Sequence, residues 1–192
     1  MNLRVKNKWV VGLTGNILSG KSTALSYFAK YGAATLSADE IVAKLYEKPT
    51  IQKQLNKWFN TTQKAQIAKQ IFTHPPKRKQ LENFIHPLVL KEGLKQIKQE
   101  KKKLVVFEIP LLFEAGCDKM TDLNVLIVAD PKTLPARLKG RKMSQNVYQA
   151  RLKTQWPEAQ KAARADIILF HKNKKDLGAK IKRFCEAFDL FQ

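Results

Sequence analysis

The segment Gly15-Asn16-Ile17-Leu18-Ser19-Gly20-Lys21-Ser22 decides the fold of this chain. It matches the pattern G-x-x-x-x-G-K-[ST], in which a glycine-rich turn joins a buried strand to a helix. The apolar run at residues 9–14 predicts that strand, and residues 21–31 have helical spacing up to Gly32, which is typical of a helix end. Because the pattern has the flanking elements that it requires, it predicts a loop that holds the phosphates of a nucleoside triphosphate.

The residue types in this loop suit that chemistry. Backbone N–H groups of the loop and of the helix N-terminus converge on an anion. We expect Lys21 to reach the β- and γ-phosphates, Ser22 to place its hydroxyl on Mg²⁺ and Thr23 to approach the α-phosphate. The predicted nucleotide-binding residues are therefore Gly15, Asn16, Ile17, Leu18, Ser19, Gly20, Lys21, Ser22 and Thr23.

Further apolar runs predict the rest of the sheet. They lie at residues 34–37, 104–109, 123–128 and 166–170, and helical patterns separate them. Apolar runs without alternation are typical of a parallel sheet that helices cover on both faces. From about residue 50 to residue 103 the pattern is helical throughout. We therefore predict an α/β fold, a three-layer sandwich around a parallel five-stranded sheet, with a helical insertion.

Composition limits the classes of partner. Lys and Arg number 36 against 16 Asp and Glu, a net charge of +20 that attracts polyanions such as nucleic acid. The lysines are spread along the chain without an aromatic ladder, which favours solvated helix faces and capture of small phosphorylated substrates. No apolar run approaches the roughly 20 residues of a membrane helix. Cys117 and Cys185 lie far apart, so we expect no disulfide framework and a cytoplasmic protein. We expect a monomer first, with an oligomer as the alternative.

Three carboxylates follow predicted strands. Asp39 is a candidate for the base or orienting group that prepares the phosphate acceptor, and spacing alone equally permits a helix N-cap. Glu108 is interpreted first as an ordinary strand-end carboxylate, with the Mg²⁺ water shell as the alternative. Asp130 precedes a proline and is interpreted as a turn residue.

Basic side chains are candidates for covering the phosphates. Arg137 and Arg141 lie four residues apart on one predicted helix face, where they either close over the γ-phosphate or remain solvated. His86 has no cysteine or acidic pair at metal-binding spacing, so a structural histidine is the ordinary interpretation.

In their order along nearly the whole chain, these motifs resemble the dephospho-CoA kinase family. The resemblance rests on the loop, on Ala38-Asp39-Glu40-Ile41 and on two further segments. Leu81-Glu82-Asn83-Phe84-Ile85-His86-Pro87 and Ile109-Pro110-Leu111-Leu112-Phe113-Glu114 are the most diagnostic, because other P-loop kinases lack them in this order.

The resemblance implies a reaction and residue roles. ATP, with Mg²⁺ held in part by Ser22, would phosphorylate the ribose 3′-hydroxyl of dephospho-CoA to give coenzyme A and ADP. Asp39 would be the base, with Lys21 and Arg141 on the transferring phosphate. The acceptor would contact Asp39, His86, Pro110, Leu111, Leu112 and Phe113. The implied domains are a nucleotide-binding core (1–48, 104–130 and 157–192), a helical CoA-substrate domain (49–103) and a lid (131–156).

The chain departs from the family pattern at several positions. Asn16 and Leu18 stand where the family usually has glycine, and Ser37 stands where it has aspartate. Leucine tolerates a positive φ poorly, so we expect Leu18 to stiffen or reshape the loop. The polar pair and glycine that usually follow the last strand are replaced by Phe170, His171 and Asn173.

Two alternatives remain at this point. A kinase of the nucleotide-monophosphate type shares the loop and lid but does not explain His86-Pro87 or Pro110-Leu111-Leu112. A nucleic-acid-binding protein that uses ATP as a switch rests on the net charge alone.

Overall fold

The structure is a computed structural model, and it describes residues 2–189. The chain divides into two compact units, one formed by Met1–Leu36 with Gln99–Gln192 and the other by Ser37–Lys98. Helix α2 (Ala38–Leu45) therefore belongs to the second unit, although the sequence grouped it with the core.

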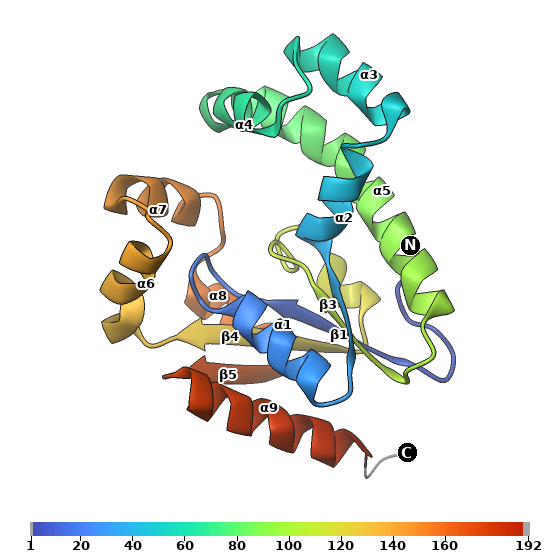
Figure 1. The fold of residues 1–192 in the computed structure, drawn as a ribbon, viewed down its shortest axis with the longest axis vertical. Coiled ribbons are helices and arrows are strands. Elements are labelled where there is room, and N and C mark those ends of the chain that lie inside the picture. Colours follow the sequence, from blue (N-terminus) through green and yellow to red (C-terminus); the bar gives the residue numbers. More distant parts are fainter. Residues whose placement is uncertain (1, 190–192) are drawn as a thin grey trace. The chain divides into compact units, whose positions relative to one another are not determined.

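The first unit is built on a five-stranded sheet (Figure 1). Strand β1 is central, and it pairs in parallel with β3 and β4, while β4 pairs in parallel with β5. The order across the sheet is β2-β3-β1-β4-β5. The predicted parallel α/β fold is confirmed. The strand bounds are Trp9–Thr14 (β1), Ala34–Ser37 (β2), Leu104–Glu108 (β3), Leu123–Ala129 (β4) and Ile167–His171 (β5).

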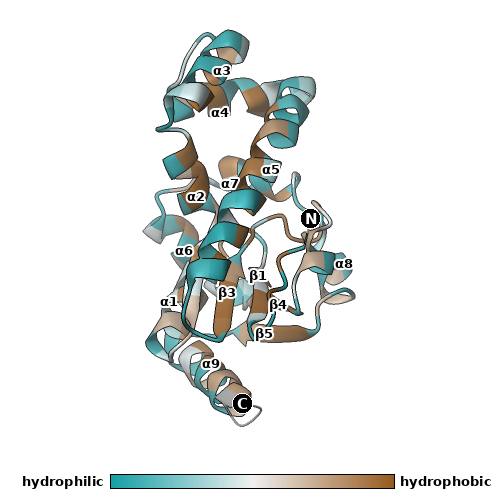
Figure 2. Cartoon of the chain, turned by 90° about the vertical axis from the view of Figure 1, so that its right-hand side faces the viewer, coloured by the Kyte–Doolittle hydropathy of each residue, from teal (hydrophilic) through white to brown (hydrophobic). Residues whose placement is uncertain are grey.

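Helices α1 (Lys21–Lys30) and α9 (Lys174–Asp189) pack together on one face of this sheet (Figure 1). The strands are the hydrophobic elements, whereas these helices mix hydrophobic and hydrophilic residues (Figure 2). Removal of apolar side chains from water is the main stabilising term for such a layer. The core on this face contains Val11, Leu13, Ala24, Phe28, Val106, Val125, Ile127, Leu169, Leu177 and Ile181.

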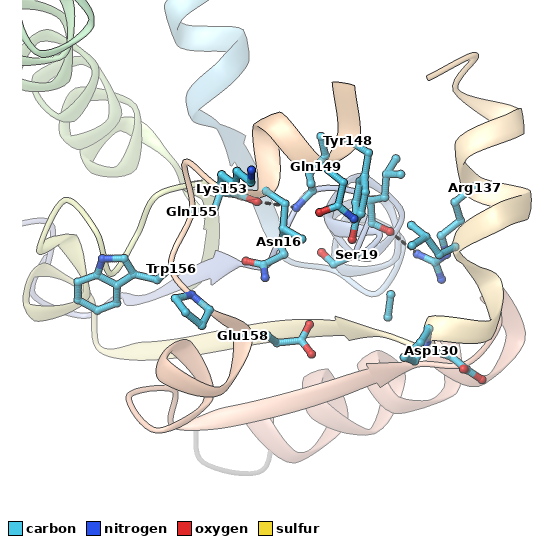
Figure 3. Close-up of a pocket in the computed structure, with 17 residues that line it drawn as sticks. Asn16, Ser19, Asp130, Arg137, Tyr148, Gln149, Lys153, Gln155, Trp156 and Glu158 are labelled. Carbon is cyan, nitrogen blue, oxygen red and sulfur yellow. Dashed lines mark hydrogen bonds between the residues drawn. The ribbon is translucent and has the colours of Figure 1, made fainter. Parts of the chain in front are cut away.

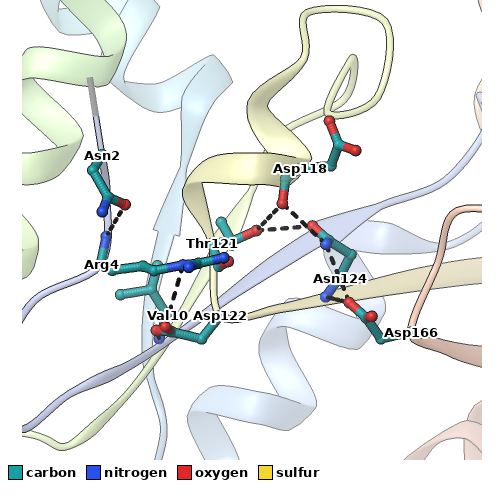
Figure 4. Close-up of polar contacts among 8 residues, drawn as sticks. All are labelled: Asn2, Arg4, Val10, Asp118, Thr121, Asp122, Asn124 and Asp166. Atoms are coloured by element: carbon teal, nitrogen blue, oxygen red, sulfur yellow. Dashed lines mark hydrogen bonds and ion pairs between the residues drawn. The ribbon is translucent and has the colours of Figure 1, made fainter.

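A polar network aligns the starts of the central strands (Figure 4). The Val10 N–H donates to Asp122 Oδ2 at 2.8 Å, and the Asn124 N–H donates to Asp166 Oδ2 at 2.7 Å. The Thr121 hydroxyl donates to Asn124 Oδ1 at 2.8 Å. These bonds tie the start of β4 to β1 and to the residue before β5, and each contributes about 1 kcal/mol.

Short helices follow β4. The sequence predicts helical stretches at residues 133–139 and 144–154, and the structure has α6 (Leu134–Gly140) and α7 (Gln145–Leu152) there. It adds the 3-10 turn η2 (Pro131–Thr133) and helix α8 (Glu158–Ala162). Another 3-10 turn, η1 (Cys117–Met120), precedes β4. The hydroxyl of Ser144 accepts from the Val147 N–H and caps α7.

The second unit is helical, as the sequence predicted. After α2 it contains α3 (Pro49–Phe59), α4 (Lys64–Thr73) and α5 (Pro75–Gln99), the last of which reaches one residue beyond the unit. The rings of Trp58 and Phe84 pack edge to face at 5.1 Å and join α3 to α5. Within residues 2–189, no helix combines the length and apolar composition that a membrane span requires.

Candidate active site

The phosphate-binding loop leaves the carboxyl end of β1 and enters α1 through Gly20. Gly20 is the N-cap at φ 101, so no side chain caps the helix, and the first turn has no acidic residue. A Cβ on Gly20 would lie 2.1 Å from His171 Nδ1, and one on Gly15 would lie 2.6 Å from the Ile127 carbonyl oxygen. The close packing therefore requires both glycines, and the uncapped helix N-terminus suits an anion.

Lys21 lies across this loop. Its Nζ donates to the carbonyl oxygens of Gly15 at 2.9 Å and Asn16 at 3.3 Å. Asn16 Oδ1 and Ser19 Oγ are buried and have no hydrogen-bond partner among the described residues. Because buried polar atoms are nearly always paired, these oxygens fit a loop that receives a polar ligand.

The outer side of the loop is held by groups from two other elements. Arg137 Nη1 donates to the Leu18 carbonyl at 2.8 Å, and His171 Nδ1 lies 3.0 Å from the Ser19 carbonyl. A carbonyl only accepts, so His171 Nδ1 must carry the proton. Burial is the main cause that lowers the pKa of His171. Leu18 has φ 64, a backbone conformation that favours glycine. The loop therefore keeps a positive φ at this position although the residue is leucine.

A cavity of ≈ 610 Å³ lies beside the loop (Figure 3). Residues 16–19, the turn after β4, α7 and residues 155–158 line it. Gln155 Oε1 accepts from the Ile17 N–H at 2.8 Å at its edge. Burial raises the pKa of Glu158, which also lines the cavity. The sequence had no spacing signal for the contacts of Gln155, Glu158 or His171 with this region.

The three candidate carboxylates have different environments. Asp39 is exposed in the first turn of α2, and Ser37 is the N-cap, with no side-chain capping bond. The capping alternative for Asp39 is therefore wrong. Glu108 is buried at the end of β3. Asp130 accepts from the Lys132 N–H at 2.9 Å, which confirms its turn role.

The two arginines of the lid segment also differ. Arg137 bonds to the loop, as described above, and burial is the main cause that lowers its pKa. Arg141 is exposed at the C-cap of α6. In the helical unit, His86 is half-buried on α5, and burial lowers its pKa against the opposing effect of Glu82.

The side chains of the segment after β3, for which acceptor contacts were predicted, are buried to different degrees. Leu112 is 0% exposed and Phe113 is 1% exposed, while Pro110 and Leu111 are half-buried. Leu112 methyl carbons would lie 3.0 Å from a Cβ on Gly12, so this side chain fills the space beside β1. Leu112 and Phe113 therefore pack in the core, and the acceptor contacts expected for them stay a prediction.

Comparison with known proteins identifies the family. A dephospho-CoA kinase family model matches residues 9–176. The dephospho-CoA kinase of Fusobacterium nucleatum is 30% identical over 189 residues, which cover 93% of this chain and 97% of that protein. That of Bartonella quintana is 32% identical over 171 residues, with coverage of 83% and 87%.

Solved structures share the fold of this chain. A crystal structure of a Thermus thermophilus protein has a TM-score of 0.86 and 28% identity, and the match covers 95% of this chain and 98% of that one. The dephospho-CoA kinase from Campylobacter jejuni, at 24% identity, a TM-score of 0.62 and coverage of 94% and 95%, shares the fold. This chain belongs to the dephospho-CoA kinase family.

Proposed function

We propose that this kinase transfers the γ-phosphate of ATP to the ribose 3′-hydroxyl of dephospho-CoA, giving coenzyme A and ADP. The observation that carries the proposal is the phosphate-binding loop, whose helix begins at the bare backbone of Gly20. This loop lies in a chain whose family match spans residues 9–176.

Lys21, Arg141 and Ser22 would act on the phosphates. Lys21 already lies over the loop, and Arg141 is exposed on the lid segment, residues 131–156, where it is available to the transferring phosphate. Cations placed where negative charge develops stabilise the transition state. Ser22 would hold Mg²⁺, which neutralises charge on the phosphates when it is bound.

Asp39 is the proposed base for the ribose hydroxyl. Its carboxylate is exposed and lies in the first turn of α2, where no capping bond engages it. A carboxylate of this kind can accept the hydroxyl proton once the acceptor is within hydrogen-bonding distance.

Residues 49–103 are the proposed domain for the CoA moiety, and residues 49–98 of it lie in the helical unit Ser37–Lys98. The acceptor contacts that the family resemblance implies are Asp39, His86, Pro110, Leu111, Leu112 and Phe113. Both cysteines are buried thiols, which fits a cytoplasmic enzyme. We propose a monomer with ATP and dephospho-CoA as its partners and no specific nucleic acid.

An assay of ADP release with and without dephospho-CoA tests this function. We expect turnover that depends on the acceptor, with a product that carries the new phosphate on the 3′-oxygen. An acceptor that lacks the ribose 3′-hydroxyl is the matched control and should give only background hydrolysis. ADP release that is the same with and without dephospho-CoA would overturn the proposal.

A further inference from the structure

Hydrogen bonds hold both edges of one peptide group in the phosphate-binding loop, the group between Asn16 and Ile17. The carbonyl oxygen of Asn16 accepts from the Ser19 N–H at 3.0 Å and from Lys21 Nζ at 3.3 Å. The N–H on the other side of the same peptide belongs to Ile17, and it donates to Gln155 Oε1 at 2.8 Å (Figure 3). Bonds on both edges fix the plane of this peptide, and with it the directions of the neighbouring N–H groups.

Gln155 belongs to a short connection, the stem (residues 153–157), which leads from α7 to α8. The stem has no regular secondary structure of its own. Turn hydrogen bonds join it to α7, among them the Gln155 N–H to the Leu152 carbonyl at 3.0 Å, and contacts with other elements fix it further. The residue after Gln155 supplies one, because the Trp156 N–H donates to Glu114 Oε1 at 2.9 Å. This bond limits where the neighbouring glutamine side chain can reach.

Glu114 is itself held by a buried charge. Lys161 Nζ lies 2.9 Å from Glu114 Oε1, and the lysine side chain is 0% exposed and the glutamate 12% exposed. The contact lacks hydrogen-bond geometry and is therefore an ion pair. A buried ammonium requires a counter-charge, so Lys161 fixes the carboxylate that receives the stem.

We propose that Gln155 is a positioning residue for the phosphate-binding loop, and that the side-chain oxygen of Glu114 places it by accepting from the Trp156 N–H. The inference rests on one part of the proposed function, namely that the phosphate-binding loop binds ATP. The Asn16–Ile17 peptide is oriented before ATP arrives, so binding does not have to order it. Glu114, at the end of the Ile109–Glu114 motif, thereby acts on the nucleotide site through the stem.

The first test is the variant Gln155→Ala, with Gln160→Ala, an exposed glutamine on α8, as its control. Loss of one hydrogen bond should weaken ATP binding about five-fold, equivalent to about 1 kcal/mol, as measured by calorimetry with Mg²⁺. KM for ATP should rise similarly and KM for dephospho-CoA should stay unchanged, while the unfolding midpoint of the ATP-free protein falls by no more than the loss of one hydrogen bond accounts for. Wild-type ATP affinity, or an equal rise of both KM values, would overturn the inference.

The second test separates the stem contact from the folding role of the ion pair. Glu114→Gln alone leaves the Lys161 charge buried without a partner and destabilises the fold. The double variant E114Q/K161M removes both charges but keeps an oxygen for the Trp156 N–H. The variant E114M/K161M removes that oxygen as well, and both double variants have apolar or neutral side chains of similar size.

We expect E114Q/K161M to bind ATP as the wild type does and E114M/K161M to bind it about five-fold more weakly, on the estimate of one hydrogen bond. Gln155→Ala should weaken ATP binding less when it is added to E114M/K161M than when it is made in the wild type. The two sets of changes are not additive, because both break the same chain of contacts. Equal ATP affinity of the two double variants would contradict the proposal.

ATP affinity is measured without an acceptor, so these outcomes do not depend on the reaction. If the wild type shows no turnover with dephospho-CoA but the affinities follow the expected pattern, the proposed function fails and the positioning role stands. If the wild type shows acceptor-dependent turnover but Gln155→Ala binds ATP with unchanged affinity, the proposed function stands and the positioning role fails.

Discussion

Arg137 donates a hydrogen bond of 2.8 Å to the carbonyl oxygen of Leu18, the residue that the loop holds at φ 64. A leucine in this left-handed region is strained, because its Cβ approaches the following carbonyl group. The guanidinium bond stabilises that arrangement from outside the loop. The same arginine donates from Nη2 to the His171 carbonyl at 3.3 Å, so one side chain connects the loop to the end of β5.

This strain predicts an unusual order of stability at position 18. Leu18→Gly should be more stable than Leu18→Ala by about 1 kcal/mol, because both remove the side chain but only glycine adopts a positive φ freely. Urea unfolding of the two variants measures the difference. The exposed helical position Ala29 on α1 is the control, where Ala29→Gly should cost about 1 kcal/mol. A Leu18→Ala variant as stable as Leu18→Gly would show that position 18 is not strained.

His171 predicts a dependence of stability on pH. Burial lowers its pKa below the ordinary 6.5, so the unfolded chain binds more protons at this residue than the native chain does as the pH falls. The free energy of unfolding should therefore decrease as the pH falls through about 6.5, by at most about 1.4 kcal/mol per pH unit from this residue. In His171→Asn this part of the decrease should disappear, whereas the exposed control His74→Asn should keep it. Denaturant titrations at a series of pH values decide between these outcomes.

Asp39→Asn tests the proposed base. The amide cannot accept the hydroxyl proton, so kcat should fall by about 10²- to 10⁴-fold while the fold is retained. Glu40→Gln, which changes the exposed neighbour in the same helical turn, is the matched control and should keep kcat within about two-fold, since a surface change of this kind has little effect. Steady-state kinetics with saturating ATP and dephospho-CoA measure both, and near-normal turnover in Asp39→Asn would remove this residue from the mechanism.

Arg141→Ala tests the lid cation. We expect kcat to fall by about 10²- to 10³-fold, because a preorganised donor to the transferring phosphate is lost. Arg141→Lys should recover only part of the activity, since an ammonium lacks the planar pair of donors. Lys139→Ala on the same helix removes an exposed positive charge and controls for the net charge of the lid. If the two alanine variants lose activity equally, the effect is one of general charge and not of Arg141.

Much of the fold follows from local sequence. The run Trp9–Thr14, the glycines at 15 and 20 and the helix from Lys21 occur in the structure as the pattern predicts. Their period and turn chemistry are set by neighbours in the chain, so they can be read without a tertiary structure. Helix α8 was missed, because its five residues are too few for a helical period to be visible.

Some side-chain environments could not be predicted. Leu112 and Phe113 carry the family motif, and the sequence gives no sign that both lie fully within the core. Arg137 and Arg141 have the same spacing signal, yet one is bonded to the loop and the other is exposed. Which partner a long side chain finds depends on groups distant in the chain, and no local period encodes that.

The sequence by itself determined that this chain has a phosphate-binding loop between a buried strand and a helix, because glycine conformation and helix N-terminal N–H groups are local properties. Only the tertiary structure decided how the loop is held. Arg137, Gln155 and His171 reach it from positions separated from it by more than a hundred residues. Folding brings them to the same edge of the sheet, where their hydrogen bonds fix a loop that its own sequence, with Leu18 at a positive φ, would disfavour.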